Sequence, residues 1–346
     1  MGKIIQAVIF LTTIYLIRHA ESEGNLCRRL LGQHDGNVTL RGLRQIADLK
    51  RRFENIHVDA CYCSDLTRAE NTALAVTEPN GLEYRVDPGF REVGVGDWEN
   101  FPVGYLNTYH GLKMIQFGRD PVNWSVPGSE TFPQYTRRFL DSMNQAVLRH
   151  EGGVIAIVTH SMVMRGALST LFPDLKQPSS CNTAVSCLTY ENGVYTPQWI
   201  YDGSHLSPEN ASLGRQKWWQ QDGAQGDDTF WYRPGLTPLE ELQAPESPIA
   251  YTVLEDQRPV GLICLSEENA ETGRVDYIGL IPAYRGFDLA VQLMGQGITD
   301  LRDRGKHWMR LRGGDDPILE ALCRKLLFVK DGADWVLDLS YRVMAI

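Results

Sequence analysis

The sequence predicts an α/β protein with two domains: a three-layer α/β/α domain with a mainly parallel sheet, followed by a smaller α+β domain. Two apolar runs, 13–17 and 154–159, are rich in β-branched residues and lack polar alternation. Such runs are typical of strands buried on both faces of a parallel sheet. The length of 346 residues favours two domains over one.

Each of these two runs ends at a histidine. Arg18 and His19 follow the first run, and His160 follows the second. Ligands bind at the carboxyl ends of the strands in an open α/β sheet, so we expect both histidines at a binding site there. Taken alone, the two short motifs leave other interpretations open. His19 could lie in a solvated loop, and His160 could be a hydrogen-bonded core histidine or half of a zinc site.

A third apolar run, 58–63, leads into a predicted helix with the sequence Ser-Asp-Leu-Thr-Arg-Ala at 64–69. Ser64 or Asp65 is expected to cap this helix, because both side chains can accept a hydrogen bond from the first free N–H groups. This cap would place Arg68 in the first turn of the helix.

Four motifs occur in a fixed order along the first part of the chain. They are Arg-His-Ala-Glu-Ser-Glu-Gly-Asn at 18–25, Ser-Asp-Leu-Thr-Arg-Ala at 64–69, Phe-Arg-Glu-Val-Gly-Val-Gly-Asp-Trp-Glu at 90–99 and Thr-His-Ser at 159–161. With them the chain resembles the histidine phosphatase superfamily, which contains the cofactor-dependent phosphoglycerate mutases. The resemblance covers residues 1–205, ends in a predicted hairpin of 185–190 and 194–201, and implies a phosphoglycerate mutase-like fold.

The resemblance implies that His19 is the nucleophile, and the chemistry agrees. A neutral imidazole attacks a phosphate monoester readily, and the phosphohistidine formed is labile enough to hydrolyse in a second step. Phosphoryl transfer spreads negative charge over three oxygens, so fixed cations and donors around the phosphate carry most of the catalysis. The candidate phosphate-binding residues are Arg18, Asn25, Arg68 and His160.

By the same resemblance, Glu92 is the acid that protonates the leaving alkoxide. A plain ion pair between Arg68 and Glu92 on the surface is the alternative. No metal is expected, because no closely spaced histidine, cysteine or carboxylate pattern accompanies His160, although His34 and His110 are further candidates for a zinc site.

The expected activity is a metal-independent phosphomonoester hydrolase of the histidine acid phosphatase type, acting on a small phosphorylated metabolite. The insert at 101–134 is short, whereas phosphoglycerate mutases carry a longer one with basic and proline-rich elements. Residues 124–131, Trp-Ser-Val-Pro-Gly-Ser-Glu-Thr, resemble the Pro-Gly-Glu-Ser region of compact, broadly acting phosphatases. A phosphoglycerate-type phosphomutase and a non-catalytic sensor of phosphorylated ligands stay open as alternatives.

Beyond residue 205 the composition changes, and a second domain is predicted over 206–346. Its first part, 206–248, is expected to hold a linker and the first helices. The remaining elements are expected as strands at 249–254, 260–266, 274–280 and 308–311, a long helix after 281–286, a helix at 317–326 and a final strand pair.

This order, with Pro-Ala-Tyr-Arg-Gly at 282–286, resembles the acetyl-CoA-dependent GNAT acetyltransferases. The resemblance implies a loop whose N–H groups bind the cofactor pyrophosphate at a helix N-terminus. That loop consists here of Arg285, Gly286, Phe287, Asp288, Leu289 and Ala290. Asp288 stands where the family has a glycine, and Cys323 stands where it has a tyrosine acid. An active acetyltransferase and a degenerate binding or packing module therefore both stay open.

The overall composition narrows the partners. A net charge of −9 disfavours nucleic acid, and no apolar stretch reaches the length of a membrane span. The apolar opening, 1–13, lacks a small-residue cleavage site, so we expect an extension or a cloning artefact and not a secretory leader. Seven cysteines without a disulfide-framework spacing indicate a reducing, cytoplasmic setting.

Overall fold

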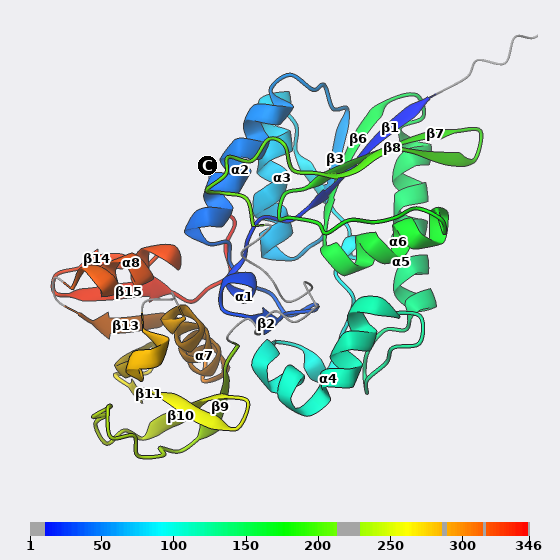
Figure 1. Cartoon of the computed structure of the whole chain (residues 1–346). Helices are drawn as coiled ribbons and strands as arrows, with labels where there is room; N and C mark the ends of the chain where they lie inside the picture. The colour runs from blue at the N-terminus through cyan, green and yellow to red at the C-terminus, as the bar shows by residue number, and fades with distance from the viewer. Residues whose placement is uncertain (1–10, 213–228, 286–288, 314–315, 345–346) are drawn as a thin grey trace, which may run out of the picture.

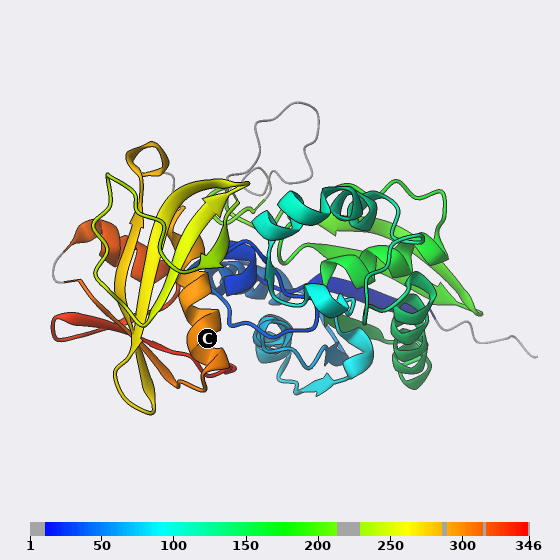
Figure 2. The ribbon, with the colours of Figure 1, turned by 90° about the horizontal axis from the view of Figure 1, so that it is seen from below.

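The structure is a computed structural model that describes residues 11–212, 229–285, 289–313 and 316–344. Two sheets with separate hydrophobic cores lie side by side, as Figures 1 and 2 show. The predicted N-terminal extension falls almost entirely outside the described residues.

The first sheet has six strands in the order β4-β3-β6-β1-β7-β8, and its first four strands are parallel. The two strands predicted to end at histidines lie side by side in its centre. Ile14, Leu16 and Ile17 of the first strand and residues 155–158 of the second are fully buried. The predicted hairpin forms the antiparallel edge. The strands are β1 (Thr12–Arg18), β3 (Ala60–Cys63), β4 (Tyr84–Val86), β6 (Val154–Thr159), β7 (Val185–Glu191) and β8 (Val194–Asp202).

Helices cover both faces of this sheet, because successive residues of a strand point to opposite sides. Leu16 packs in the core formed with α5 and α6, and Ile17 packs in the core formed with α2 and α3. The covering helices are α2 (Leu40–Phe53), α3 (Thr67–Asn80), α5 (Phe132–Arg149) and α6 (Ser161–Leu171). The predicted three-layer α/β/α architecture is confirmed.

The remaining elements of this part of the chain are four short pieces and one longer helix. The short ones are α1 (Glu23–Leu26), η1 (Pro88–Phe90), η2 (Gly96–Trp98) and the two-stranded sheet of β2 (Arg29–Leu30) and β5 (Phe101–Pro102); the helix is α4 (Val103–Arg119), which lies in the insert.

The second sheet has seven strands in the order β14-β15-β13-β12-β11-β10-β9, and only β12 and β13 are parallel to each other. Its elements follow the predicted order. They are β9 (Trp231–Pro234), β10 (Ile249–Glu255), β11 (Arg258–Glu267), β12 (Thr272–Leu280), η3 (Pro282–Tyr284), α7 (Ala290–Asp303), β13 (Trp308–Arg312), α8 (Pro317–Lys325), β14 (Val329–Asp331) and β15 (Asp334–Asp338).

The helices expected within 206–248 are absent from 206–212 and 229–248, the parts of that stretch that the structure describes. Strand β9 occurs there instead and pairs with β10. Four prolines between 234 and 248 explain the difference, since each removes a backbone donor that a helix needs.

The domain boundary predicted at 205/206 is not marked by a break in packing. Asn210 donates to Asp48 of α2 (2.8 Å), so residues just past 205 still pack on the first sheet's helices. The boundary at 205/206 stays a prediction.

The predicted cap of α3 is wrong. The N-cap residue is Leu66, and neither Ser64 nor Asp65 caps the helix with its side chain. Asp35, from a loop far earlier in the chain, accepts hydrogen bonds from the Thr67 amide (3.0 Å) and hydroxyl (2.6 Å). Asp65 is instead paired with the guanidinium of Arg91.

All seven cysteines are buried and none forms a disulfide. No helix in the described part of the chain is both long enough and apolar enough to cross a membrane.

Candidate active site

His19 and His160 meet at the carboxyl ends of β1 and β6. The two ring centroids are 5.0 Å apart, and both side chains are buried. The backbone continues the parallel pairing up to this point, because the His19 amide donates to the Thr159 carbonyl (2.8 Å). The predicted convergence of the two histidines at one sheet edge is therefore what the structure shows.

The ring of His19 is held in one tautomer. Its Nδ1 lies 2.7 Å from the carbonyl oxygen of Ala20, which can only accept, so Nδ1 carries the proton and Nε2 keeps its lone pair. Burial, followed by the positive charges of Arg68 and Arg18, lowers the pKa of His19 well below its usual value. The free site thus holds His19 as a neutral imidazole with Nε2 available for attack.

Arg68 lies in the first turn of α3, as predicted, and is almost completely buried. It donates to the carbonyls of Gly32 (2.8 Å) and His34 (2.9 Å), and its guanidinium is 3.6 Å from the carboxylate of Asp35. The loop of residues 32–35 therefore fixes the orientation of Arg68 and supplies the cap of its helix.

Arg18, at the end of β1, donates from Nη1 to the carbonyl of Ser180. The Asn25 side chain belongs to the first turn of α1, where its oxygen accepts from the Ser22 amide (3.1 Å) and from the Asn182 amide group (3.3 Å). With its oxygen turned to these donors, the side-chain nitrogen of Asn25 is the atom that can donate to a phosphate. Asn182 also donates to the His19 carbonyl (3.1 Å).

The Glu92 side chain lies at the N-terminus of α6, the helix that begins directly after His160. Its two side-chain oxygens accept from the backbone amides of Val163 (2.8 Å) and Met162 (3.2 Å). Arg138 of α5 holds the Glu92 backbone by donating to its carbonyl (3.1 Å). Across the described residues no ion pair joins Arg68 and Glu92 at the surface, the alternative raised from the sequence.

Several buried polar atoms at this edge have no hydrogen-bond partner within the described ranges. They are Nε of Arg18, both ring nitrogens of His160 and Oδ1 of Asn182. A buried donor left unpaired costs about 1–3 kcal/mol, so such a group of atoms is typical of a ligand-binding site. Burial and the charge of Arg68 also lower the pKa of His160 well below its usual value. The arrangement can bind an oxyanion beside the neutral ring of His19.

Sequence reasoning missed Asp35, Arg138 and Asn182. Each lies far in sequence from the group that it orients, and none belongs to the four motifs, so only the folded chain brings them to the site. His34 and His110, the further zinc candidates, do not join His160. His34 contacts Tyr341, and His110 packs against Trp98. Within the described ranges, no group of three His, Cys, Asp or Glu side chains could hold a metal ion.

The family model described as "Histidine phosphatase superfamily (branch 1)" matches residues 14–202, more than half of the chain. The chain belongs to this superfamily. Among curated relatives, the histidine phosphatase domain is similar to a protein named "Probable phosphoglycerate mutase GpmB" from Yersinia pestis (strain Pestoides F). The two are 30% identical over 158 residues, which cover 46% of this chain and 74% of the relative.

A second family model, that of the GNAT acetyltransferase family, matches residues 215–316, so the chain also carries a GNAT domain.

Solved structures agree with the histidine phosphatase fold. Bacillus stearothermophilus YhfR is 27% identical, with a TM-score of 0.54 over 57% of this chain and 100% of its own. A phosphoglycerate mutase from Bacillus anthracis str. Sterne has a TM-score of 0.53 at 20% identity, covering 57% of this chain and 96% of its own. A mycobacterial glucosyl-3-phosphoglycerate phosphatase has a TM-score of 0.51 at 20% identity, covering 56% of this chain and 100% of its own. The last two show the fold alone.

The candidate cofactor loop of the GNAT domain is described only in part. Arg285 donates to the Leu280 carbonyl (2.9 Å), and α7 begins at Ala290 after Leu289, which provides no side-chain cap. Gly286, Phe287 and Asp288 lie outside the described residues. Cys323 is completely buried in the second core, and burial raises the pKa of its thiol to about 12, which favours a packing role over that of an acid.

Proposed function

We propose that the histidine phosphatase domain is a metal-independent phosphomonoester hydrolase that works through a phosphohistidine on His19. One observation carries the proposal. The neutral ring of His19, whose Nδ1 is hydrogen-bonded to a carbonyl, lies beside His160 and next to Arg18 in the chain. Both ring nitrogens of His160 and Nε of Arg18 are buried and lack partners among the described residues. This arrangement supports a nucleophile that faces donors for an oxyanion.

In the proposed reaction, Nε2 of His19 attacks the phosphorus and the bond to the ester oxygen breaks. Arg18, Arg68, His160 and the side-chain nitrogen of Asn25 stabilise the charge on the three equatorial oxygens. Glu92 gives its proton to the leaving alkoxide and becomes a carboxylate. That carboxylate then accepts a proton from water, which attacks the phosphohistidine and releases inorganic phosphate and neutral His19.

The test of the nucleophile uses p-nitrophenyl phosphate. His19→Ala should abolish turnover, and the wild type, quenched in alkali during turnover, should carry one phosphoryl group on His19 by mass spectrometry. Chelators should leave the rate unchanged. Strict dependence on an added divalent metal would contradict the mechanism, because a metal would then supply the charge that we assign to the two arginines.

A phosphomutase is the second candidate, favoured by the name of the Yersinia relative. Net release of phosphate from phosphoglycerates identifies a hydrolase, whereas exchange of the phosphoryl group between positions without release identifies a mutase. A protein that binds phosphorylated ligands with no turnover would be a sensor. A phosphate-release screen over sugar phosphates, nucleotides and phosphoglycerates would show which small phosphorylated metabolite is the substrate.

For the GNAT domain we propose weak binding of acetyl-CoA. The first turn of α7 has no side-chain cap, so its amide groups can receive pyrophosphate, and Arg285 lies close by in the chain. The carboxylate of Asp288, in the same loop of the sequence, would repel the negatively charged pyrophosphate. We expect this repulsion to weaken acetyl-CoA binding by about one to two decades in affinity. Calorimetry should therefore find weak or no binding by the wild type and a gain for Asp288→Gly. Tight wild-type binding with no gain would contradict the proposal.

A further inference from the structure

The GNAT domain touches the phosphatase domain next to the candidate phosphate site. Helix α7 lies against α1, the short helix that follows His19 and carries Asn25 (Figure 2). A Cβ at Gly295 of α7 would come within 2.4 Å of the Cβ of Cys27, so the two segments are in close contact. The hollow between them measures ≈ 10 Å³, room for about one water molecule. This surface is a packed interface and not a ligand cleft.

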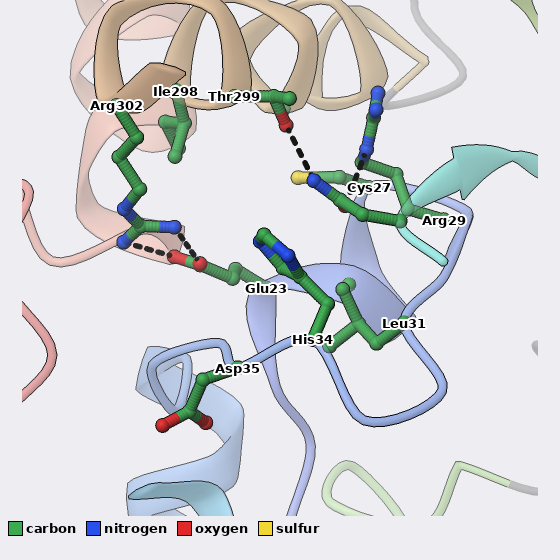
Figure 3. Close-up of a pocket in the computed structure, with 12 residues that line it drawn as sticks. Glu23, Cys27, Arg29, Leu31, His34, Asp35, Ile298, Thr299 and Arg302 are labelled. Carbon is green, nitrogen blue, oxygen red and sulfur yellow. Dashed lines mark hydrogen bonds and ion pairs between the residues drawn. The ribbon is translucent and has the colours of Figure 1, made fainter. Parts of the chain in front are cut away.

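Arg302, near the end of α7, is the central residue of the interface. Its guanidinium forms an ion pair with Glu23, the first residue of α1, through both carboxylate oxygens (Figure 3). The two side chains are only 13% and 12% exposed. Arg302 also donates to the Leu339 carbonyl (2.8 Å) and lies 4.5 Å above the ring of Tyr341. A partly buried pair of this kind resists screening by solvent and fixes the geometry of both partners.

Tyr341 continues this chain of contacts to the loop that orients Arg68. Its hydroxyl lies 3.3 Å from Nε2 of His34, whose carbonyl accepts from Arg68. The tail that follows also contacts α3, the helix of Arg68, because Asn71 donates to the Arg342 carbonyl (3.0 Å). Through α7 and the tail, the GNAT domain therefore reaches two of the elements that present phosphate-binding groups.

We propose that Arg302 is a positioning residue of the phosphatase site: the GNAT domain, through Arg302, holds α1 and loop 32–35 in the arrangement that binds phosphate. The inference rests on the proposed function, since it concerns the same residues. Its physical basis is preorganisation, because groups that are already held in place lose less freedom when the anion binds. The phosphatase site is in this sense completed by the second domain.

The test measures the affinity for inorganic phosphate by calorimetry, together with kcat and KM for p-nitrophenyl phosphate, on the full chain. Arg302→Gln should raise the dissociation constant for phosphate about 3- to 30-fold and raise KM in parallel. Arg302→Lys keeps the charge and should recover part of the loss. Arg304→Gln is the matched control, because Arg304 pairs with Asp300 and Glu267 inside the GNAT domain, and it should change neither constant.

The inference would be overturned if Arg302→Gln folds and keeps the wild-type phosphate affinity and KM. It would also be overturned if Arg304→Gln changed these two constants as much as Arg302→Gln does. If Arg302→Gln does not fold, Glu23→Gln and Tyr341→Phe decide in its place, and wild-type affinity in both would overturn the inference. A wild type that binds phosphate in an Arg302-dependent way without turnover refutes the hydrolase and supports the positioning role. A wild type that neither binds phosphate nor turns over substrate refutes both.

Discussion

At the scale of single residues, the surroundings of His19 and His160 favour the neutral form of both rings. Burial and the charges of Arg18 and Arg68 act in the same direction on His19, and the carbonyl of Ala20 selects the tautomer. A protonated ring would have no lone pair for attack. In the proposed mechanism the two arginines therefore have two effects: they bind the phosphate, and they help to keep His19 unprotonated before the phosphate arrives.

This environment gives a prediction for pH. An unperturbed histidine is half protonated at about pH 6.5. Because the pKa values of His19 and His160 lie below their usual range, we expect both rings to be mainly neutral at that pH in the free protein. NMR of ring-labelled histidine, assigned with His19→Ala and His160→Ala, measures this directly. Protonation of either ring at or above pH 6.5 would contradict the prediction.

The role of Glu92 gives a second prediction, because a good leaving group does not need a proton. Glu92→Gln should lower kcat on alkyl phosphates by about 10²- to 10⁴-fold and affect p-nitrophenyl phosphate much less. Glutamine keeps the size and one acceptor oxygen for the amides of Met162 and Val163. Steady-state kinetics on glycerol phosphate and p-nitrophenyl phosphate would measure the difference. Equal losses on both would make Glu92 a structural residue.

At the scale of elements, the strands were the most predictable part of the chain. The β-branched runs before His19 and His160 form β1 and β6 as expected, because short apolar runs rich in β-branched residues are typical of strands buried on both faces. The hairpin of β7 and β8 followed from its Glu-Asn-Gly turn. The cap of α3 could not be predicted, since Asp35 is remote in sequence and competes with the local candidate Asp65, which pairs with Arg91.

The cap leads to a third prediction. Asp35→Ala removes the acceptor for the Thr67 amide and the carboxylate beside Arg68, so it should cost about 0.5–2 kcal/mol of unfolding free energy and raise KM. Asp65→Ala breaks a partly exposed pair with Arg91 and should cost less than about 1 kcal/mol. Urea unfolding and kinetics on both variants test this order. A larger loss for Asp65→Ala than for Asp35→Ala would contradict the prediction.

At the scale of the whole molecule, the contact between the two domains could not be derived from local patterns. Gly295 lies inside α7, where glycine costs about 0.5–1 kcal/mol relative to alanine. The structure supplies the reason, because Cys27 occupies the space of its missing side chain. The four motifs pointed to the two central strands that end at His19 and His160 and to Arg68, but they carried no information about Arg302, whose partner Glu23 stands near the other end of the chain.

The last prediction tests whether the two domains form one cooperative unit. Gly295→Ala gains helix propensity but forces a Cβ against Cys27 at 2.4 Å, so it should lower the free energy of unfolding by about 1–3 kcal/mol. Gly118→Ala in α4 is the control, because its Cβ would meet no atom within 4 Å and alanine there should be neutral or stabilising. Thermal unfolding of the wild type should show one transition, shifted downward only in Gly295→Ala. Two separate transitions, with only the GNAT one shifted, would mean that the domains unfold independently and that α7 and α1 pack without energetic coupling.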